Sequence, residues 1–160
     1  FSKEEFEKFE LHIEWKLPEG GNSGIFYHIK EGFEETSEVA PEYQLLDDEG
    51  WEDLNNAKLS PWQKAGADYA MYSPNTKFKK LYPSGEWNCT KIIFTKKKVE
   101  YWLNEQKILT FVPWSEDWYK RKNSGKWKNS KSYGKYKKGY IGLQDHNSSI
   151  SFRNMKIRKL

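Results

Sequence analysis

The run from Gly142 to Asn147 (GLQDHN) holds the residues with the clearest chemical potential, because a histidine there follows an amide and a carboxylate at the end of an expected strand. His146, beside Gln144 and Asp145, could act as a tuned general acid or base, since histidine titrates near neutral pH. A single histidine is more often structural than catalytic. No Ser–His–Asp order or reactive-cysteine context supplies a nucleophile. The run therefore indicates a candidate proton-transfer group rather than a complete catalytic motif.

Two adjacent acids, Asp47 and Asp48, follow the strand-like run Glu42–Leu46 (EYQLL). Such a pair could bind a hard cation or take part in acid–base chemistry, whereas an Asx-type turn is the simpler explanation. The spacing of Cys, His and acidic residues matches no zinc site, and the glycine and glutamate pattern of an EF-hand is missing. No cofactor is assigned, and a divalent cation without assigned ligands stays open.

The glycine-rich run Gly20–Gly24 (GGNSG) joins the first two expected strands. Its glycines permit tight backbone geometry, and Asn22 and Ser23 could present short polar groups at the rim of a site. A phosphate-binding loop is disfavoured because no Lys–Thr pair and no helix follow. A plain hairpin turn is the alternative.

Short runs of β-forming residues, separated by turn residues, predict a nearly all-β sandwich or jelly roll. An aromatic fraction of 17% supports this fold class, because Trp, Tyr and Phe fit a pleated, half-buried surface. Only Glu116–Lys122 is predicted to be helical, inside a long connection from Pro113 to Lys138 that we expect to cover a site. The predicted strands are Phe9–Leu17, Gly24–Ile29, Glu42–Leu46, Asp68–Tyr72, Trp87–Thr95, Lys98–Leu103, Gln106–Thr110, Tyr140–Asp145 and Ile150–Lys156.

Alternation along these strands separates buried positions from exposed ones. Several of the polar positions are Glu, Gln, His or Trp, whereas Lys, Thr and Ser are usual on a solvated strand. We predict that they form one face suited to a sugar, since carboxylates and amides bind hydroxyl groups and an aromatic ring stacks on a pyranose. For any single residue, simple solvation is the alternative. The residues assigned to this face are Glu14, Glu42, Gln44, Trp102, Gln144 and His146.

The composition is that of a folded domain. A length of 160 residues is enough to bury a core, and no linker or internal repeat divides the chain, so we predict one domain over residues 1–160. The only cysteine, Cys89, excludes an internal disulfide framework and is expected to be a buried structural thiol. No stretch approaches the roughly 20 apolar residues that a membrane span needs.

Positive charge is concentrated between Lys120 and Lys138, where the chain carries nine basic residues and no acidic residue. Such a run could attract the phosphates of a nucleic acid, and the interleaved Trp127, Tyr133 and Tyr136 could stack on its nucleobases. A solvated loop is the simpler interpretation. We therefore predict no nucleic-acid partner.

Four runs, in order, resemble the 3-keto-disaccharide hydrolase domain family, long described as domain of unknown function 1080. They are Phe9–Lys16 (FELHIEWK), Gly21–Tyr27 (GNSGIFY), Gly85–Asn88 (GEWN) and Gly139–His146 (GYIGLQDH), and the closing Phe152–Arg158 (FRNMKIR) is also similar. The resemblance covers the chain from about Phe9 to the C-terminus. It implies a concanavalin A-like jelly-roll sandwich of two antiparallel sheets, in secreted, periplasmic or lipid-anchored proteins of glycan-degrading bacteria. Members carry a further N-terminal segment with a strand, to which no run of this chain corresponds.

The resemblance also implies cleavage of glycosides, including disaccharides, that are already oxidised at C3 of the sugar. A ketone at C3 acidifies the C2 proton, so a base can remove it, the C1 substituent leaves and water adds back. By matching motifs, His146 and Glu14 are the candidate catalytic residues. The candidate substrate-binding residues are Asn22, Ser23, Glu42, Gln44, Asp47, Asn88, Trp102 and Gln144, with Trp102 stacked on the ring.

Three other functions fit the same sequence. A non-catalytic carbohydrate-binding module would need the aromatic face but no tuned acid or base. Hydrolysis of an unoxidised glycoside would need two carboxylates at a set separation, which Glu14 and Glu42 could supply. A structural or adhesion domain would bind its partner through the basic loop, and the affinity of this binding would depend strongly on the salt concentration.

Overall fold

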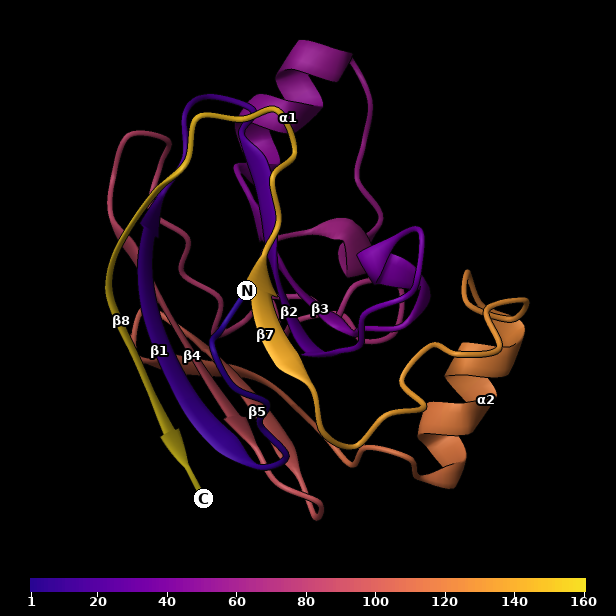
Figure 1. The fold of residues 1–160 in the computed structure, drawn as a ribbon. Helices are drawn as coiled ribbons and strands as arrows, with labels where there is room; N and C mark the ends of the chain where they lie inside the picture. The colour runs from indigo at the N-terminus through magenta and orange to yellow at the C-terminus, as the bar shows by residue number, and fades with distance from the viewer.

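Two antiparallel sheets pack face to face and contain all eight strands of the chain (Figure 1). The structure, a computed structural model, describes residues 1–160. The larger sheet has the strand order β6-β5-β4-β1-β8, and the smaller sheet has the order β3-β2-β7. The strands are β1 (Phe9–Lys16), β2 (Asn22–Ile29), β3 (Glu42–Leu46), β4 (Asn88–Phe94), β5 (Val99–Leu103), β6 (Gln106–Phe111), β7 (Tyr140–Leu143) and β8 (Ser151–Lys159). The predicted all-β class and two-sheet arrangement are confirmed.

The core forms where alternate residues of the two sheets meet. Leu11, Ile13 and Trp15 of β1 are buried there, as the alternation predicted. Two side-chain hydrogen bonds stabilise this interior. The indole nitrogen of Trp15 donates to the Thr90 hydroxyl at 2.9 Å, and the hydroxyls of Tyr27 and Tyr101 join the two sheets at 2.8 Å. Tyr27 and Tyr101 are tolerated in this core because each hydroxyl finds a partner.

Helical structure is confined to the connections between strands. Helix α2 (Glu116–Ser124) contains the predicted Glu116–Lys122 and continues to Ser124. Helix α1 (Asp48–Asn55) was not predicted, although its first turn carries Asp48 and Glu49, which favour the positive end of a helix dipole. Two short 3₁₀ helices, Thr36–Glu38 and Pro61–Gln63, lie on either side of β3 and α1 in the sequence. None of these helices is long and apolar enough to cross a bilayer.

One local prediction is wrong, and one alternative is excluded. The segment Asp68–Tyr72 is not a strand, because it makes only isolated bridges between Asp68 and Tyr43 and between Asp68 and Tyr72. The run Gly20–Gly24 does not close a hairpin, since β1 pairs with β4 and β8 whereas β2 pairs with β3 and β7. This run therefore carries the chain from one sheet to the other. Strands β5 and β6 form a hairpin around Asn104-Glu105, between the two strands predicted there.

Stacked aromatic rings order the long connection after β6. The rings of Trp127 and Tyr133 stack with centroids 4.5 Å apart, and the ring of Trp118 of α2 lies parallel to that of Tyr133 with centroids 6.2 Å apart. The indole nitrogen of Trp127 donates to the carbonyl of Tyr69 at 3.2 Å. This connection is thus ordered by buried rings although residues 125–139 contain no helix or strand.

Cys89 is half-buried rather than buried. It lies on the outer face of β4, where its sulfur is 3.4 Å from Nε2 of His12. Alternation along β4 explains this position, since Asn88 and Thr90 on either side point inward and are buried.

Candidate active site

The outer face of the smaller sheet, which points away from the core, is apolar at both ends and polar in the middle. One end is an apolar cluster that contains Phe26 and Ile29, and the other contains Leu46 and Leu59. A cavity of about 210 Å³ lies between them. Its lining residues are Asn22, Ser37, Glu42, Gln44, Leu46, Trp51, Leu59, Gln63, Tyr69, Lys126, Trp127, Gln144 and His146. A volume of this size suits a small ligand such as a single sugar ring.

Strand register brings the polar residues of the cavity together. Tyr43 and Leu45 of β3 are buried in the core, so Glu42 and Gln44 point to the opposite face. Gln44 lies opposite Gly24 of β2, and the backbone N–H of Gln144 donates to the carbonyl of Gly24 at 2.8 Å. Side chains from β3 and from the end of β7 therefore flank a position in β2 that has no side chain.

Glu42 occupies the space left by Gly24. A β-carbon built at Gly24 would lie only 2.0 Å from Oε1 of Glu42, so the carboxyl group rests directly on the glycine backbone. Glu42 is 6% exposed, and its carboxyl group forms no hydrogen bond or ion pair within the protein. Only a glycine on the neighbouring strand permits this position.

The environment of Glu42 makes it suitable for proton transfer. Burial raises the pKa of Glu42 to about 8, the positive charge of Lys126 opposes this increase, and the negative charge of Asp68 adds to it. A carboxyl group that titrates close to the working pH can both accept and return a proton. The cavity therefore contains a tuned acid–base group in contact with the space for a ligand.

Amide side chains provide the hydrogen-bonding groups of the cavity. The amide nitrogen of Gln44 donates to the side-chain oxygen of Asn22 at 2.7 Å and to the carbonyl of Leu45 at 3.3 Å. The Gln44 oxygen and the Asn22 nitrogen form no further hydrogen bond within the protein, and neither does the side chain of Gln144 or His146. Free donors and acceptors around a small polar cavity suit the hydroxyl groups of a sugar.

Aromatic rings form the other walls. Trp51 comes from α1, Tyr69 from the segment before β4, and Trp127 from the connection that leads to β7. Lys126 lies beside Trp127 on the same connection. The long connection, which we expected to cover a site, contributes these two residues to the cavity.

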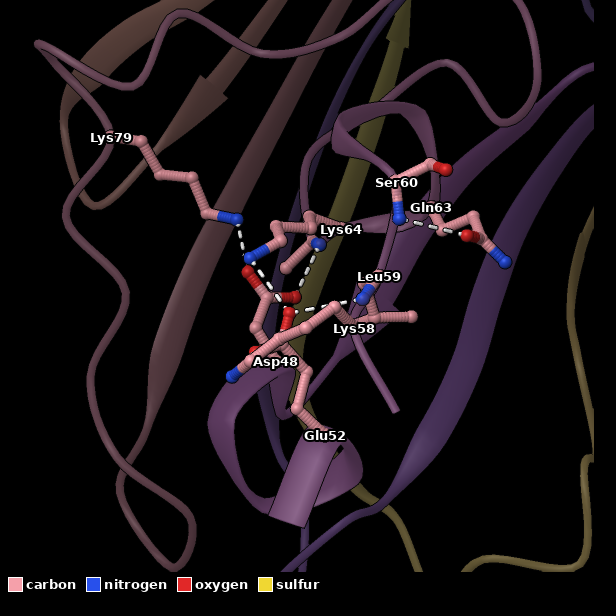
Figure 2. Close-up of polar contacts among 9 residues, drawn as sticks. Asp48, Glu52, Lys58, Leu59, Ser60, Gln63, Lys64 and Lys79 are labelled. Carbon is pink, nitrogen blue, oxygen red and sulfur yellow. Dashed lines mark hydrogen bonds and ion pairs between the residues drawn. The ribbon is translucent and has the colours of Figure 1, made fainter. Parts of the chain in front are cut away.

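A network of ion pairs fixes the wall that α1 and the following segment provide (Figure 2). Glu52 accepts hydrogen bonds from the backbone N–H of Leu59 at 3.1 Å and from Lys58 at 2.7 Å, and it pairs with Lys64 at 3.0 Å. Gln63 accepts the backbone N–H of Ser60 at 2.9 Å through its side-chain oxygen, which leaves its amide nitrogen free. Trp51, Leu59 and Gln63 are thereby held in place along one side of the cavity.

Five of the ten residues predicted from the sequence line this cavity, namely Asn22, Glu42, Gln44, Gln144 and His146. Glu14 and Trp102 do not, and the prediction that they share this face is wrong. Both lie on the outer face of the larger sheet, on the other side of the sandwich, because their neighbours along β1 and β5 point into the core. Glu14 accepts hydrogen bonds from Arg153 at 2.6 Å and Asn154 at 2.9 Å, and Lys91 lies 4.0 Å above the Trp102 ring.

Ser23, Asp47 and Asn88 also lie outside the cavity lining, and each has a partner in the protein. The hydroxyl of Ser23 is fully buried and donates to the carbonyl of Gln144 at 2.7 Å. Asp47 accepts the backbone N–H of Gly20 at 2.9 Å. Asn88 accepts the backbone N–H of Tyr82 at 2.9 Å and donates to the carbonyl of the same residue at 3.2 Å. Of these contacts, the one made by Ser23 holds the backbone of Gln144, which lines the cavity.

The acids considered as cation ligands have protein partners as well. Asp48 accepts the backbone N–H of Ala65 at 2.8 Å and pairs with Lys79 (Figure 2). No group of three or more His, Cys, Asp or Glu side chains is arranged to hold a metal ion.

Comparison with known proteins shows which family the chain resembles. Residues 1–158 match the family described as the 3-keto-alpha-glucoside-1,2-lyase-like domain. The chain is 32% identical over 175 residues to a 3-keto-disaccharide hydrolase of Bacteroides thetaiotaomicron. That alignment covers 97% of this chain but 59% of the relative, so the chain spans about three-fifths of the length of that curated protein.

Solved structures agree with the sequence match. Two proteins of Parabacteroides distasonis, both assigned provisionally as glycosyl hydrolases, superpose with TM-scores of 0.92 at 39% identity and 0.75 at 26% identity. Each superposition covers 99% of this chain, and 75% and 81% of the respective structures. The carbohydrate binding module CBM66 of Bacillus subtilis shares the fold alone, with a TM-score of 0.54 at 8% identity over 99% of this chain and 79% of the module.

The match runs along nearly the whole chain, and the two Parabacteroides structures share both its fold and part of its sequence. The chain belongs to the 3-keto-alpha-glucoside-1,2-lyase-like domain family.

Proposed function

We propose that this chain cleaves glycosides whose sugar carries a ketone at C3, and that Glu42 and His146 perform the proton transfers. The observation that carries the proposal is Glu42, a buried carboxyl group without a protein partner that faces a sugar-sized cavity. Burial raises its pKa to about 8. A group that exchanges a proton with the substrate needs a pKa close to the working pH. The name of the Bacteroides relative supports the choice of substrate.

The proposed reaction is an elimination followed by hydration. The ionised carboxylate of Glu42 takes the proton from C2, and the C–H electron pair forms an enolate with its charge on the C3 oxygen. When the C3 carbonyl forms again, the C1–O bond breaks and a C1=C2 double bond remains. His146 protonates the departing oxygen. Addition of water across the double bond gives a free 3-keto sugar, so the net reaction is hydrolysis.

Amides and aromatic rings of the cavity would hold the sugar during this reaction. Asn22, Gln44 and Gln144 have free groups for its hydroxyls. Trp127 is a better candidate for stacking than Trp102, because it lines the cavity whereas Trp102 lies on the far side of the sandwich.

Hydrolysis of an unoxidised glycoside fits this geometry less well. That reaction requires two carboxyl groups on either side of the scissile bond, at a separation of roughly 5–10 Å. Glu42 is the one acid among the residues that line the cavity, since Glu14 lies on the other sheet. A single carboxyl group is consistent with elimination, because the C3 ketone makes the C2 proton acidic enough for one base to remove.

The proposal is tested with paired disaccharides that differ only in oxidation at C3. The protein is incubated with each member of the pair, and the released monosaccharides are separated by chromatography. We expect release from the keto form and none from its parent. Equal release from both, or binding of both without release, would contradict the proposal, and the second outcome would indicate a carbohydrate-binding module.

The position of Glu42 should depend on Gly24. In a Gly24→Ala variant the added methyl group would lie 2.0 Å from the present position of Oε1, so the carboxyl group must move away. We expect activity on the keto disaccharide to fall about 30-fold or more while the fold is kept, because only the end of a flexible side chain is displaced. The Gly24→Ala/Glu42→Gln double variant should be no less active than Glu42→Gln alone, since both changes act on one group. Additive losses would show that Gly24 acts independently of Glu42.

A secreted or periplasmic location, with a lipid anchor in the precursor, extends the same proposal. It is supported by the family resemblance of the sequence. Detection of the protein in the extracellular, periplasmic or membrane fraction of the source cells would agree with it, and recovery from the cytoplasm alone would contradict it.

A further inference from the structure

Lys126 is the one lysine or arginine among the residues that line the cavity. Its ammonium nitrogen lies 3.4 Å from the hydroxyl of Tyr69, 4.5 Å from the centre of the Tyr69 ring and 5.0 Å from the centre of the Trp127 ring. No carboxylate of the chain lies within ion-pair distance of it. Two aromatic rings therefore hold this cation at the wall of the cavity without neutralising it.

Two lysines in a neighbouring part of the molecule, unlike Lys126, are paired with acids. Lys64 pairs with Glu52 at 3.0 Å, and Lys79 pairs with Asp48 (Figure 2). In those pairs the positive charge is already balanced by the protein. Lys126 differs because no carboxylate of the protein neutralises its charge, which is therefore available to a ligand. Glu42 lies close enough for this charge to lower its pKa.

We propose that Lys126 is a catalytic residue whose ammonium group binds the C3 oxygen of the keto sugar and stabilises the enolate. This inference rests on the proposed function. When the C2 proton moves to Glu42, one negative charge moves from the carboxylate to the C3 oxygen, and Lys126 keeps all of its own protons. A cation that is already in place where this charge develops lowers the barrier without a further proton transfer.

The same charge also acts on the base. The positive charge of Lys126 lowers the pKa of Glu42 against the effect of burial. Loss of this charge should therefore have two consequences. The enolate is less stable, and the pH at which Glu42 becomes ionised increases.

The test isolates enolate formation from cleavage by using a 3-keto-1,5-anhydro sugar, which has no leaving group at C1. Exchange of its C2 proton with D₂O is followed by NMR for the wild type and for Lys126→Met, Lys126→Arg and Lys128→Met. We expect Lys126→Met to slow exchange by about 100-fold, as loss of a group that stabilises an oxyanion does, and to move the acidic limb of the pH profile upward. Lys126→Arg should recover part of the loss because it restores the charge. Lys128→Met, at an exposed position outside the cavity lining, should stay within about twofold of the wild type.

Affinity for the unoxidised parent sugar separates catalysis from simple binding. This ligand has a hydroxyl instead of a carbonyl at C3, and its dissociation constant should change by less than about threefold in Lys126→Met. An equal loss of affinity and exchange would overturn the inference, because Lys126 would then be a general binding residue. Unchanged exchange in Lys126→Met would also overturn it while the proposed function stands. A wild type that neither exchanges the C2 proton nor cleaves the keto disaccharide would refute the proposed function itself.

Discussion

Glu42→Gln is expected to lower turnover of the 3-keto disaccharide roughly a thousandfold and, at the same time, to make the folded protein more stable. Glutamine has nearly the same shape but cannot accept the C2 proton. Glu42 lies against Gly24, so the amide fits the same space without displacing the backbone. Activity is lost because the base is lost, and not because the site collapses.

The gain in stability follows from the direction of the pKa shift. Burial raises the pKa of Glu42 from 4.5 to about 8, so ionisation of Glu42 opposes folding. The free energy of unfolding therefore falls as the pH rises from about 4.5 to about 8, and the effect is complete above that range. Glutamine cannot ionise, so Glu42→Gln should stabilise the protein by about 2 kcal/mol at pH 7.5 and have little effect at pH 4.

Glu14→Gln is the matched control for this experiment. Glu14 is a strand glutamate whose partners are Arg153 and Asn154, on the outer face of the other sheet. Its replacement should leave turnover within about threefold of the wild type. Turnover by Glu42→Gln close to that of the wild type, or a greater loss in Glu14→Gln, would mean that the base has been assigned to the wrong glutamate.

Asp68→Asn is expected to stabilise the protein by about 3 kcal/mol at pH 7.5. Asp68 is completely buried and accepts a hydrogen bond from the Tyr101 hydroxyl at 3.3 Å, but its other oxygen has no partner. Burial raises the pKa of Asp68 from 3.8 to about 8, although the hydroxyls of Tyr101 and Tyr27 partly oppose this increase. The folded protein therefore prefers the neutral carboxylic acid, which asparagine resembles in shape.

The pH dependence distinguishes this explanation from a general improvement in packing. A folded-state pKa above the unfolded value means that stability falls between about pH 4 and pH 8, as the unfolded chain loses the proton that the folded protein retains. The advantage of Asp68→Asn should therefore disappear at pH 4. Urea unfolding at pH 4 and pH 7.5 measures the free energy of unfolding of the variant and the wild type. Asp53→Asn, at an exposed position, is the control, and its free energy of unfolding should differ from that of the wild type by less than about 0.5 kcal/mol.

An Asp68→Asn variant that is destabilised at pH 7.5 would contradict this view of Asp68 as a buried acid that is neutral in the folded protein.

Alternation in the sequence predicts which side of a strand is buried. The inward positions of β1, β3 and β7 were correctly separated from the outward positions, and Glu42 and Gln44 do share a face. The same pattern cannot assign a strand to a sheet, because both outer faces of a sandwich carry polar residues at every second position. Glu14 was therefore placed with Glu42, although β1 belongs to the larger sheet and β3 to the smaller.

The walls of the cavity come from segments whose sequence lacks a regular hydrophobic periodicity. Trp51 lies on a short helix, and Tyr69 and Trp127 lie on irregular connections. Neither the two-residue repeat of a strand nor the 3.6-residue repeat of a helix therefore reveals them. The length of the connection before β7 was the one available signal, and this connection does contribute residues to the cavity. The contact of the Glu42 side chain with Gly24 depends on the register between β2 and β3, which only the fold establishes.

The most direct test of the central claim is the position of deuterium in the product. Cleavage of the 3-keto disaccharide is run in D₂O for a short time, and the released 3-keto sugar is analysed by NMR, with the same sugar kept in D₂O without protein as the control. If Glu42 removes the C2 proton before the C1 substituent leaves, and the proton on Glu42 exchanges with solvent before water adds across the double bond, the released sugar carries solvent deuterium at C2. Release of a sugar that keeps its original C2 hydrogen, at a rate that deuterium at C2 of the substrate does not slow, would contradict this account and would indicate direct displacement at C1.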